Sequence, residues 1–315
     1  MNKKNSSNTW VMGALAALIL ASSGGVATAA DKVRLALPTK GYWGTVVATA
    51  AQEKGLFQKA GVEAEITVFR SGADAFQALA ADAADVSLAS PTIVAQGLKK
   101  GVSTKIVGIA CQAPLGWHLV VKADSPIKNV NELSGKKVGM NSAGSLSDLL
   151  GKWAASKAGI AYELVPLGGG GVAPNLLAGN IDATVLYAPI TYDMLNKGQI
   201  RSLLDFSKEM PKAATDTWTA SDKALSSNGK AIRNAVSALF DAVGLLQKDR
   251  DYAIDLISRN DDVSKDIATF EYERTIMNLP STNSLDPALI NQYLDFAKPF
   301  APDLARADKI TASAQ

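Results

Sequence analysis

Histidine and cysteine are almost absent from this chain, which has one of each among 315 residues. A zinc site needs several such ligands, and a Ser-His-Asp triad would have to use the one histidine, His118. The Gly-rich phosphate loop, the Gly-x-Ser-x-Gly elbow and the His-Glu-x-x-His helix are also missing. These absences argue strongly against a zinc enzyme or a hydrolase, and more weakly against enzymes that use only carboxylates. We expect no enzyme, no metal and no cofactor.

The single cysteine, Cys111, has no partner for an internal disulfide. It directly follows an apolar run at 106–110, so we expect a buried structural thiol. A nucleophilic cysteine would need a histidine close by, and only His118 is available.

Two lysines, an apolar run and a small-x-small tripeptide mark the N-terminal segment, in the order Lys3-Lys4, 10–21 and Ala27-Thr28-Ala29. The run is shorter than the roughly 20 residues that span a bilayer. We predict a signal peptide at 1–29, cleaved after about Ala29 or Ala30; an uncleaved anchor stays open as the alternative. No cysteine lies near this site to carry a lipid, which favours the periplasm of a Gram-negative cell.

Charge is nearly balanced. No acidic residue precedes Asp31, so cleavage removes two lysines and changes the net charge from +2 to 2 − 2 = 0. A neutral chain has no electrostatic footprint for nucleic acid or anionic lipid. No later segment is apolar enough to span a membrane. The expected ligand is therefore a small molecule.

Short apolar runs alternate with helical segments from Asp31 to about Asp205, which predicts right-handed crossovers and mostly parallel sheets. The expected strands are 33–37, 63–69, 86–89, 105–110, 119–122, 137–140, 163–167 and 183–186. The expected helices are 46–54, 73–81, 91–100, 146–158, 172–178 and 189–196. Beyond about 205 the sequence becomes helical, with runs at 231–247, 252–258 and 287–296.

One pattern occurs twice, at 79–91 and at 176–189. In each copy a helix ends, a loop carries an aspartate, a short strand follows, and a proline opens the next helix. The spacing differs by one residue, so the two copies share an architecture rather than a sequence repeat. This predicts two lobes with the same plan.

Ligands of open parallel sheets lie beyond the carboxyl ends of the strands, where helices begin. In the first region these loops contain Lys40, Tyr42, Trp43, Ser71, Gly72, Ser90, Pro91 and Thr92. The aromatic pair offers flat surfaces for an organic ligand, and Lys40 offers a counter-ion for an anion. Packing beneath the helix is the alternative for either ring, and helix capping is the alternative for Ser71 or Ser90.

The second region offers a similar set of loop residues. The segment that opens the helix at 146 would present backbone N–H groups to an anion, and the four-glycine loop at 168–171 would allow close approach of a ligand. A mobile turn is the alternative for the glycines, and a structural histidine is the alternative for His118. The candidates are Trp117, His118, Asn141, Ser142, Gly144, Ser145, Gly169, Gly170 and Tyr187.

Four segments in this order, at 51–62, 79–91, 133–145 and 176–189, resemble the solute-binding proteins of the nitrate/sulfonate/taurine group of ABC importers. The thiamine-pyrimidine precursor binders, of the NMT1/THI5-like type, belong to the same superfamily. The resemblance covers about 33–205. Two features depart from the family pattern: Asp82 stands where a glycine is usual, and the first loop lacks a clearly defined set of anion-binding residues.

The resemblance implies an α/β type II periplasmic-binding-protein fold with two lobes and a two-crossing hinge. It places lobe 1 at 30–114 and 206–315, lobe 2 at 115–205, and the crossings near 113–117 and 203–207. The C-terminal helices are then expected to return to lobe 1.

The implied function is that of a monomeric periplasmic receptor that passes a solute to an ABC permease in the inner membrane. Helix N-termini, Lys40 and the aromatic pair favour a small organic anion, either sulfonate-, taurine- or nitrate-like or an aromatic carboxylate. A thiamine-pyrimidine-type heterocycle stays open, as do a sensory module and an enzyme of menaquinone or thiamine precursor synthesis on the same fold.

Overall fold

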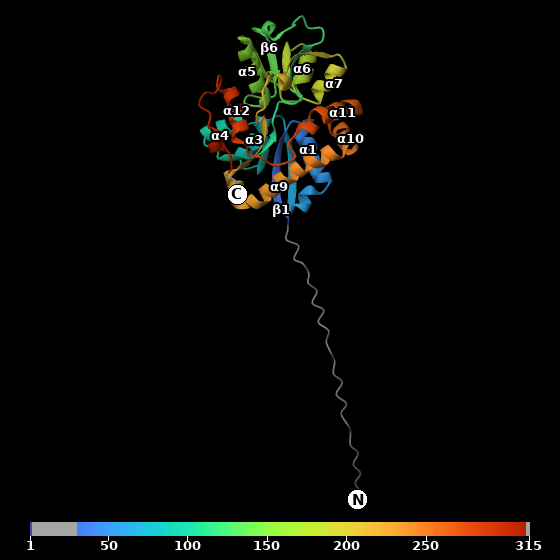
Figure 1. Cartoon of the computed structure of the whole chain (residues 1–315), viewed down its shortest axis with the longest axis vertical. Coiled ribbons are helices and arrows are strands. Elements are labelled where there is room, and N and C mark those ends of the chain that lie inside the picture. Colours follow the sequence, from blue (N-terminus) through green and yellow to red (C-terminus); the bar gives the residue numbers. More distant parts are fainter. Residues whose placement is uncertain (2–29, 313–315) are drawn as a thin grey trace.

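The computed structural model describes residue 1 and residues 30–312. These form two α/β lobes, one above the other along the long axis of the molecule (Figure 1). The predicted signal peptide lies outside the described residues, apart from Met1. None of the helices within the described range is long and apolar enough to cross a membrane.

Lobe 1 contains a five-stranded sheet with the strand order β2-β1-β3-β10-β4. The first three strands in this order run parallel, and β10 is inserted antiparallel between β3 and β4. The strands are β1 (Asp31–Pro38), β2 (Val62–Phe69), β3 (Val86–Ala89), β4 (Thr104–Cys111) and β10 (Asp216–Ser221). Its first helices are α1 (Trp43–Glu53), α2 (Leu56–Lys59), α3 (Gly72–Ala80) and α4 (Pro91–Lys99).

Lobe 2 repeats this arrangement in the order β7-β6-β8-β5-β9, with β5 antiparallel to both of its neighbours. The strands are β5 (His118–Lys122), β6 (Lys137–Met140), β7 (Glu163–Pro166), β8 (Ala183–Leu186) and β9 (Ile200–Asp205). Its helices are α5 (Leu146–Ala158), α6 (Val172–Leu177) and α7 (Ile190–Asn196), with a 3₁₀ turn at Val130–Leu133. The two sheets confirm the predicted fold class.

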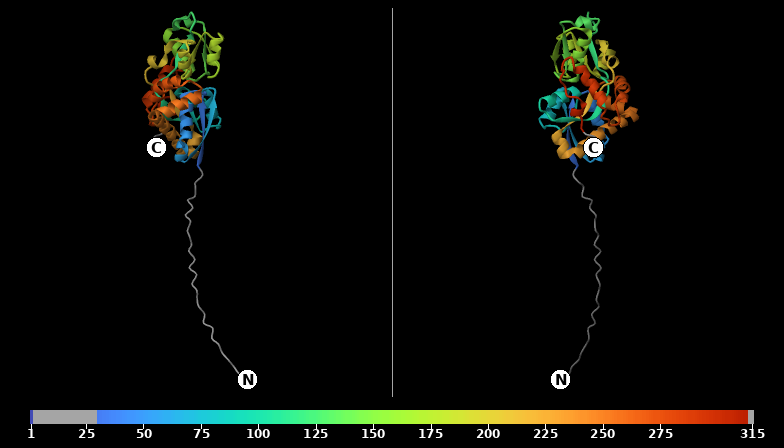
Figure 2. Two further views of the ribbon diagram at one scale, coloured as in Figure 1. Left: turned by 90° about the vertical axis from the view of Figure 1, so that its right-hand side faces the viewer. Right: turned by 60° about the vertical axis from the view of Figure 1, so that its left-hand side comes forward.

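The C-terminal helices return to lobe 1, as the resemblance implied. The long α9 packs on α1, β1 and β10, while α11 and α12 also reach α7 and α5 of lobe 2 (Figures 1 and 2). The bounds are α8 (Phe206–Glu209), α9 (Asp222–Lys248), α10 (Arg250–Asp261), α11 (Lys265–Arg274), α12 (Pro287–Ala297) and α13 (Ala307–Ile310), with a 3₁₀ turn at Ile276–Asn278.

The expectation of a purely helical C-terminal region was wrong, because β10 lies within it; β9, just before residue 205, was also missed. All six residues of β10 are buried, but four of them are Asp, Thr or Ser, so the strand does not read as an apolar run. Neighbouring strands satisfy this polarity: the Thr217 hydroxyl, for example, donates to the Ala89 carbonyl oxygen of β3 at 2.8 Å.

Two segments cross between the lobes side by side. The Ala213 N–H donates to the Gln112 carbonyl oxygen at 3.0 Å, and the Thr215 N–H donates to Cys111 at 3.0 Å. The second crossing was expected near 203–207. Strand β9 instead remains in the sheet of lobe 2 as far as Asp205, so the chain crosses after it.

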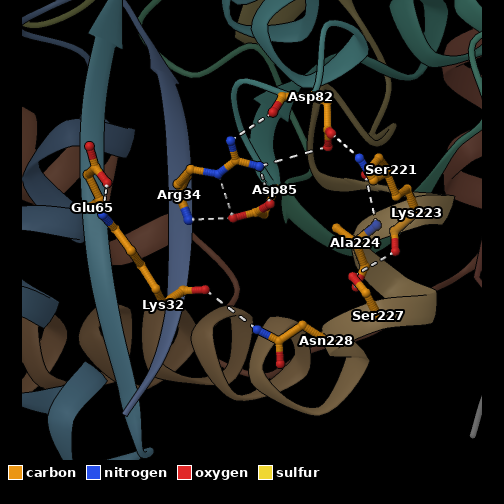
Figure 3. Close-up of polar contacts among 10 residues, drawn as sticks. All are labelled: Lys32, Arg34, Glu65, Asp82, Asp85, Ser221, Lys223, Ala224, Ser227 and Asn228. Carbon is orange, nitrogen blue, oxygen red and sulfur yellow. Dashed lines mark hydrogen bonds and ion pairs between the residues drawn. The ribbon is translucent and has the colours of Figure 1, made fainter. Parts of the chain in front are cut away.

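The aspartate of the repeated pattern accepts a backbone hydrogen bond from a neighbouring strand in both lobes. The Arg34 N–H donates to Asp85 Oδ2 at 2.8 Å, and the Lys137 N–H donates to Asp182 Oδ2 at 2.9 Å. Each contact joins a central parallel strand, within β1 at Arg34 and at the start of β6 at Lys137, to the loop before its neighbour. In lobe 1 the Arg34 guanidinium adds two more bonds to Asp85 (Figure 3).

Asp82 adopts a left-handed conformation with φ of 60°, which explains why glycine is usual there. Aspartate tolerates this region better than most residues. Its carbonyl oxygen accepts a bond from Arg34 Nη1 at 2.7 Å, and its carboxylate pairs with Lys223 (Figure 3). The departure from the family pattern therefore changes a turn at the end of lobe 1 distant from lobe 2.

Candidate functional site

A buried cavity lies where the strand ends of both lobes meet. In this closed arrangement it is small, about 30 Å³, which leaves room for a few water molecules at most. A larger ligand therefore enters while the lobes are apart. The lining residues are Pro38, Thr39, Tyr42, Gly72, Leu88, Ala89, Ser90, Ile93, Trp117, Asn141, Ser145, Leu146, Ser147, Tyr187 and Asp216.

Direct contacts between the loops hold the lobes together at this point. The Ser142 hydroxyl of lobe 2 donates to Ser71 Oγ of lobe 1 at 2.8 Å, and the Gly169 N–H donates to the Arg70 carbonyl oxygen at 3.0 Å. A Cβ on Gly169 would lie 2.2 Å from Thr39 Cγ2, well inside van der Waals contact. Gly169 is thus required for this close approach of the lobes.

Three aromatic rings from both lobes form one wall of the cavity. The Tyr42 ring centroid lies 5.8 Å from that of Trp117 and 5.9 Å from that of Tyr187, and the latter two are 5.5 Å apart. These are ordinary distances for tilted and edge-to-face pairs. Trp43 lies behind Tyr42 at 5.4 Å and does not line the cavity; its indole N–H has no partner among the described residues.

An acidic group, Asp216, stands at the start of β10 and lines the cavity with 6% of its surface exposed. The Tyr42 hydroxyl donates to Asp216 Oδ2 at 3.0 Å, and Trp117 Nε1–H donates to the Tyr42 oxygen at 3.2 Å. Burial raises the pKa of the Asp216 carboxyl to about 7, although the hydrogen bond from Tyr42 opposes this. Sequence reasoning missed this residue because it missed β10.

No lysine, arginine or histidine of the described chain lines this cavity. Lys40, the expected counter-ion, instead lines a separate open groove of about 1000 Å³ beside it, together with Arg70 and Gly170. Thr39 is common to both hollows and forms part of the wall between them.

The N-termini of three helices reach the cavity: α3 begins at Gly72, α4 follows Ser90, and α5 follows Ser145. Their first N–H groups favour an acceptor atom on a ligand. Ser90 Oγ and Thr92 Oγ1 are 3.0 Å apart and satisfy each other. Ser71 caps α3 by accepting from the Asp74 N–H at 3.1 Å, which was the alternative reading of this residue.

Asn141 begins the connection from β6 to α5 in lobe 2. Its backbone N–H donates to Ser147 Oγ at 2.9 Å, which holds the loop against α5. Its side-chain oxygen, with the amide oriented as here, is buried and has no partner among the described residues. An unpaired buried acceptor at a cavity wall is a position for a ligand donor.

His118 faces away from the cavity. Its Nδ1 lies 2.8 Å from Ser202 Oγ and its Nε2 lies 3.8 Å from Asp205 Oδ1. Burial lowers the pKa of the imidazole. The expectation that His118 and Trp117 form one wall is wrong in this respect, because neighbouring residues of the extended chain point to opposite faces.

The structure therefore brings together seven of the residues expected from the sequence: Tyr42, Gly72, Ser90, Trp117, Asn141, Ser145 and Tyr187. Ser71, Ser142 and Gly169 join the lobes instead, and Pro91 opens α4 without lining the cavity. Thr92 and Gly144 line a neighbouring hollow next to α12. No group of three or more His, Cys, Asp or Glu side chains within residues 30–312 is placed to hold a metal.

Comparison with known proteins gives a family and a fold. The sequence profile described as NMT1/THI5 like matches residues 45–253. A predicted binding protein of Brucella abortus strain 2308 is 25% identical over 223 residues, which are 69% of this chain and 68% of that protein.

Three solved structures share the fold. The alkanesulfonate-binding protein of Xanthomonas axonopodis pv. citri, bound to MOPS, superposes with a TM-score of 0.76 at 18% identity over 89% of this chain and 96% of its own. The periplasmic nitrate-binding protein of Synechocystis PCC 6803 gives 0.72 at 12% identity over 88% and 83%. A desulfurization enzyme gives 0.63 at 19% identity over 90% and 96%, so the fold also carries catalysis.

Proposed function

The chain belongs to the NMT1/THI5-like family, and from this premise we propose that it is the solute-binding receptor of an ABC importer. It takes a small organic solute between lobes 1 and 2, closes on it, and passes it to a permease in the inner membrane. The observation that carries the proposal is the buried cavity at which strand ends and helix N-termini of both lobes meet.

The closing of the two lobes is the change by which such a receptor reports a bound ligand to its permease. A ligand that touches both lobes shifts the population toward the closed form by its differential affinity for that form. Contacts such as Ser142–Ser71 and Gly169–Arg70 join the two lobes, so they exist only when these are closed. The permease would then distinguish loaded from empty receptor by the relative position of the lobes.

The periplasm is the proposed location, with the signal peptide at 1–29 removed and the mature protein a monomer. The lysines, apolar run and small-x-small site of the sequence support export. The name of the nitrate-binding relative places that protein in the periplasm as well.

Binding without turnover is proposed because the residues of nucleophilic chemistry are separated. The Cys111 thiol is buried and donates to the Ala113 carbonyl oxygen at 3.1 Å, and burial raises its pKa to about 12. His118 is held by Ser202 on the other face of its strand. An enzyme on this fold would have to rely on Asp216, and its signature would be conversion of the solute on incubation.

Native mass spectrometry of protein purified gently from its host tests the proposal. We expect a second species heavier by one small organic molecule, which is released unchanged on denaturation. Deletion of the gene should abolish uptake of that molecule. Release of a chemically altered molecule, or normal uptake in the deletion strain, would contradict a transport receptor.

A further inference from the structure

We propose that Asp216 selects the solute: the cavity takes a small molecule that presents a positively charged nitrogen group, as an ammonium or amidinium does, in preference to a simple organic anion. This inference rests on the proposed function and names the ligand class of the same cavity. It replaces the expectation of an organic anion, whose counter-ion, Lys40, lines the neighbouring groove.

Asp216 is the only acidic side chain among the lining residues, and it is almost completely buried. One hydrogen bond, from Tyr42 at 3.0 Å, holds Oδ2 in place. A carboxylate has about four acceptor positions, so a ligand donor can be added without displacing Tyr42.

The titratable neighbours of Asp216 in the described chain carry no charge at pH 7. The titratable groups that face it are Tyr42 at the start of α1, Cys111 of β4 and Tyr293 of α12, and the pKa of each is raised, so all are neutral at pH 7. Trp117, from the first crossing, adds only an indole N–H to Tyr42. A buried carboxylate without a cation is costly, and a cationic or strongly donating solute removes that cost.

The remaining walls suit the same ligand. Tyr42, Trp117 and Tyr187 line the same cavity with aromatic rings, which attract a cation and pack on a flat body. The unpaired oxygen of Asn141, another lining residue, is a second acceptor for N–H groups. The N-termini of α3, α4 and α5 offer N–H donors to an acceptor atom elsewhere on the ligand. The charged side chain of the cavity is nevertheless Asp216, so a plain carboxylate or sulfonate fits it poorly.

Selection by Asp216 can be measured through the proton that is released when the ligand binds. The pKa of Asp216 is about 7 in the free protein, so roughly half of the molecules carry a proton there at that pH. A cation or N–H donor binds the ionised form and lowers the pKa, so binding releases a proton and affinity rises from pH 6 to pH 8. An anionic solute would show the opposite sign.

Benzamidine, benzamide and benzoate test the selection, because they share one ring and differ only in the head group. At pH 8 we expect affinity to fall in that order, with about a tenfold or larger difference between benzamidine and benzoate by isothermal titration. Asp216→Asn should weaken benzamidine by about tenfold and leave benzoate unchanged or tighter. Lys122→Ala, at the half-buried last residue of β5 and outside the cavity lining, is the control and should change none of the three affinities.

Proton release is measured by repeating the benzamidine titration at pH 7 in two buffers of different ionisation enthalpy. Benzoate binding as tight as benzamidine, or proton uptake with benzamidine, would overturn the inference and leave the proposed receptor intact. The opposite failure is distinguishable. If the co-purified molecule is released chemically altered, the receptor is wrong, whatever the order of the three probes.

Discussion

The two lobes share one plan, yet they offer different chemistry to the cavity between them. Asp216 is the first residue of β10 and His118 is the first residue of β5, the antiparallel strand at the equivalent position of the other sheet. The first faces the cavity and the second faces outward to Ser202. Lobe 1 therefore supplies the charge, and lobe 2 supplies Trp117, Asn141 and Tyr187, which are uncharged.

This difference shows that a duplicated architecture determines where the site lies but not which ligand it binds. The aspartates that join strands, Asp85 and Asp182, make the same backbone contact in both lobes because the fold needs it. The strand ends at the cavity are free to differ, since packing does not determine them. Lobe 1 should therefore govern which solute binds, and lobe 2 should govern how the cavity closes.

The largest effect should come from the acid of lobe 1. The pKa of Asp216 is about 7 when folded against 3.8 when unfolded, so the unfolded chain loses its proton first as pH rises. The wild type thus loses stability between about pH 4 and pH 7. Asp216→Asn should increase the free energy of unfolding at pH 8 by on the order of 4 kcal/mol, and by little at pH 4. Denaturant titration at both pH values measures this.

Closure should depend on one glycine of lobe 2. Gly169→Ala places a Cβ against Thr39, so we expect the affinity for the solute to fall by about tenfold or more, and Thr39→Ala to restore part of it. Gly170→Ala is the matched control, because nothing lies within 4 Å of its added Cβ. Equal losses at 169 and 170 would show that loop flexibility, rather than close approach, is what binding needs.

The acid of lobe 2 should behave in the opposite way to Asp216. The pKa of Asp205 is lowered despite burial, by bonds from Ser207 and by His118 and Lys208. Its stabilisation is present above the unfolded pKa and disappears as pH falls through the folded value. Asp205→Asn should lower the free energy of unfolding at pH 7 by about 1 kcal/mol and change nothing at pH 2. A stability gain at pH 7 would contradict the comparison.

The smallest effect should come from the hydroxyl pair between the lobes. Ser142→Ala removes its 2.8 Å bond to Ser71 and leaves the capping bond of Ser71 to Asp74 intact. We expect affinity to fall by about threefold to tenfold, because one neutral hydrogen bond contributes about 1 kcal/mol. Ser71→Ala should cost stability in addition, since it also removes the cap of α3. Thermal unfolding of the two free variants separates these losses.

Much of the architecture could be predicted from the sequence, because the periodicity of apolar residues and the turn-forming residues are local signals. The strand-to-helix loops, and with them Tyr42, Ser90, Asn141 and Tyr187, are found by placing ligands at the carboxyl ends of strands. Strand β10 was not found, since half of its buried residues carry hydroxyl groups and are paired by tertiary contacts. Asp216 was lost with it.

The other differences arise from side-chain direction and from contacts between the lobes. Lys40 follows the first strand as expected, but it lines the open groove, and no local pattern tells which way it points. Gly169 is visible as part of a glycine run, whereas its requirement depends on Thr39 across the interface. The charge of the cavity depends on these long-range placements, so the sequence pointed to Lys40 as its charged group, whereas Asp216 lines it.

Small-angle X-ray scattering of the protein stripped of its co-purified solute, and then reloaded with it, tests whether the solute binds between closing lobes. We expect the radius of gyration to fall on reloading in the wild type and in Gly170→Ala, and Gly169→Val to stay expanded. A radius of gyration that is unchanged by the solute in the wild type would contradict it.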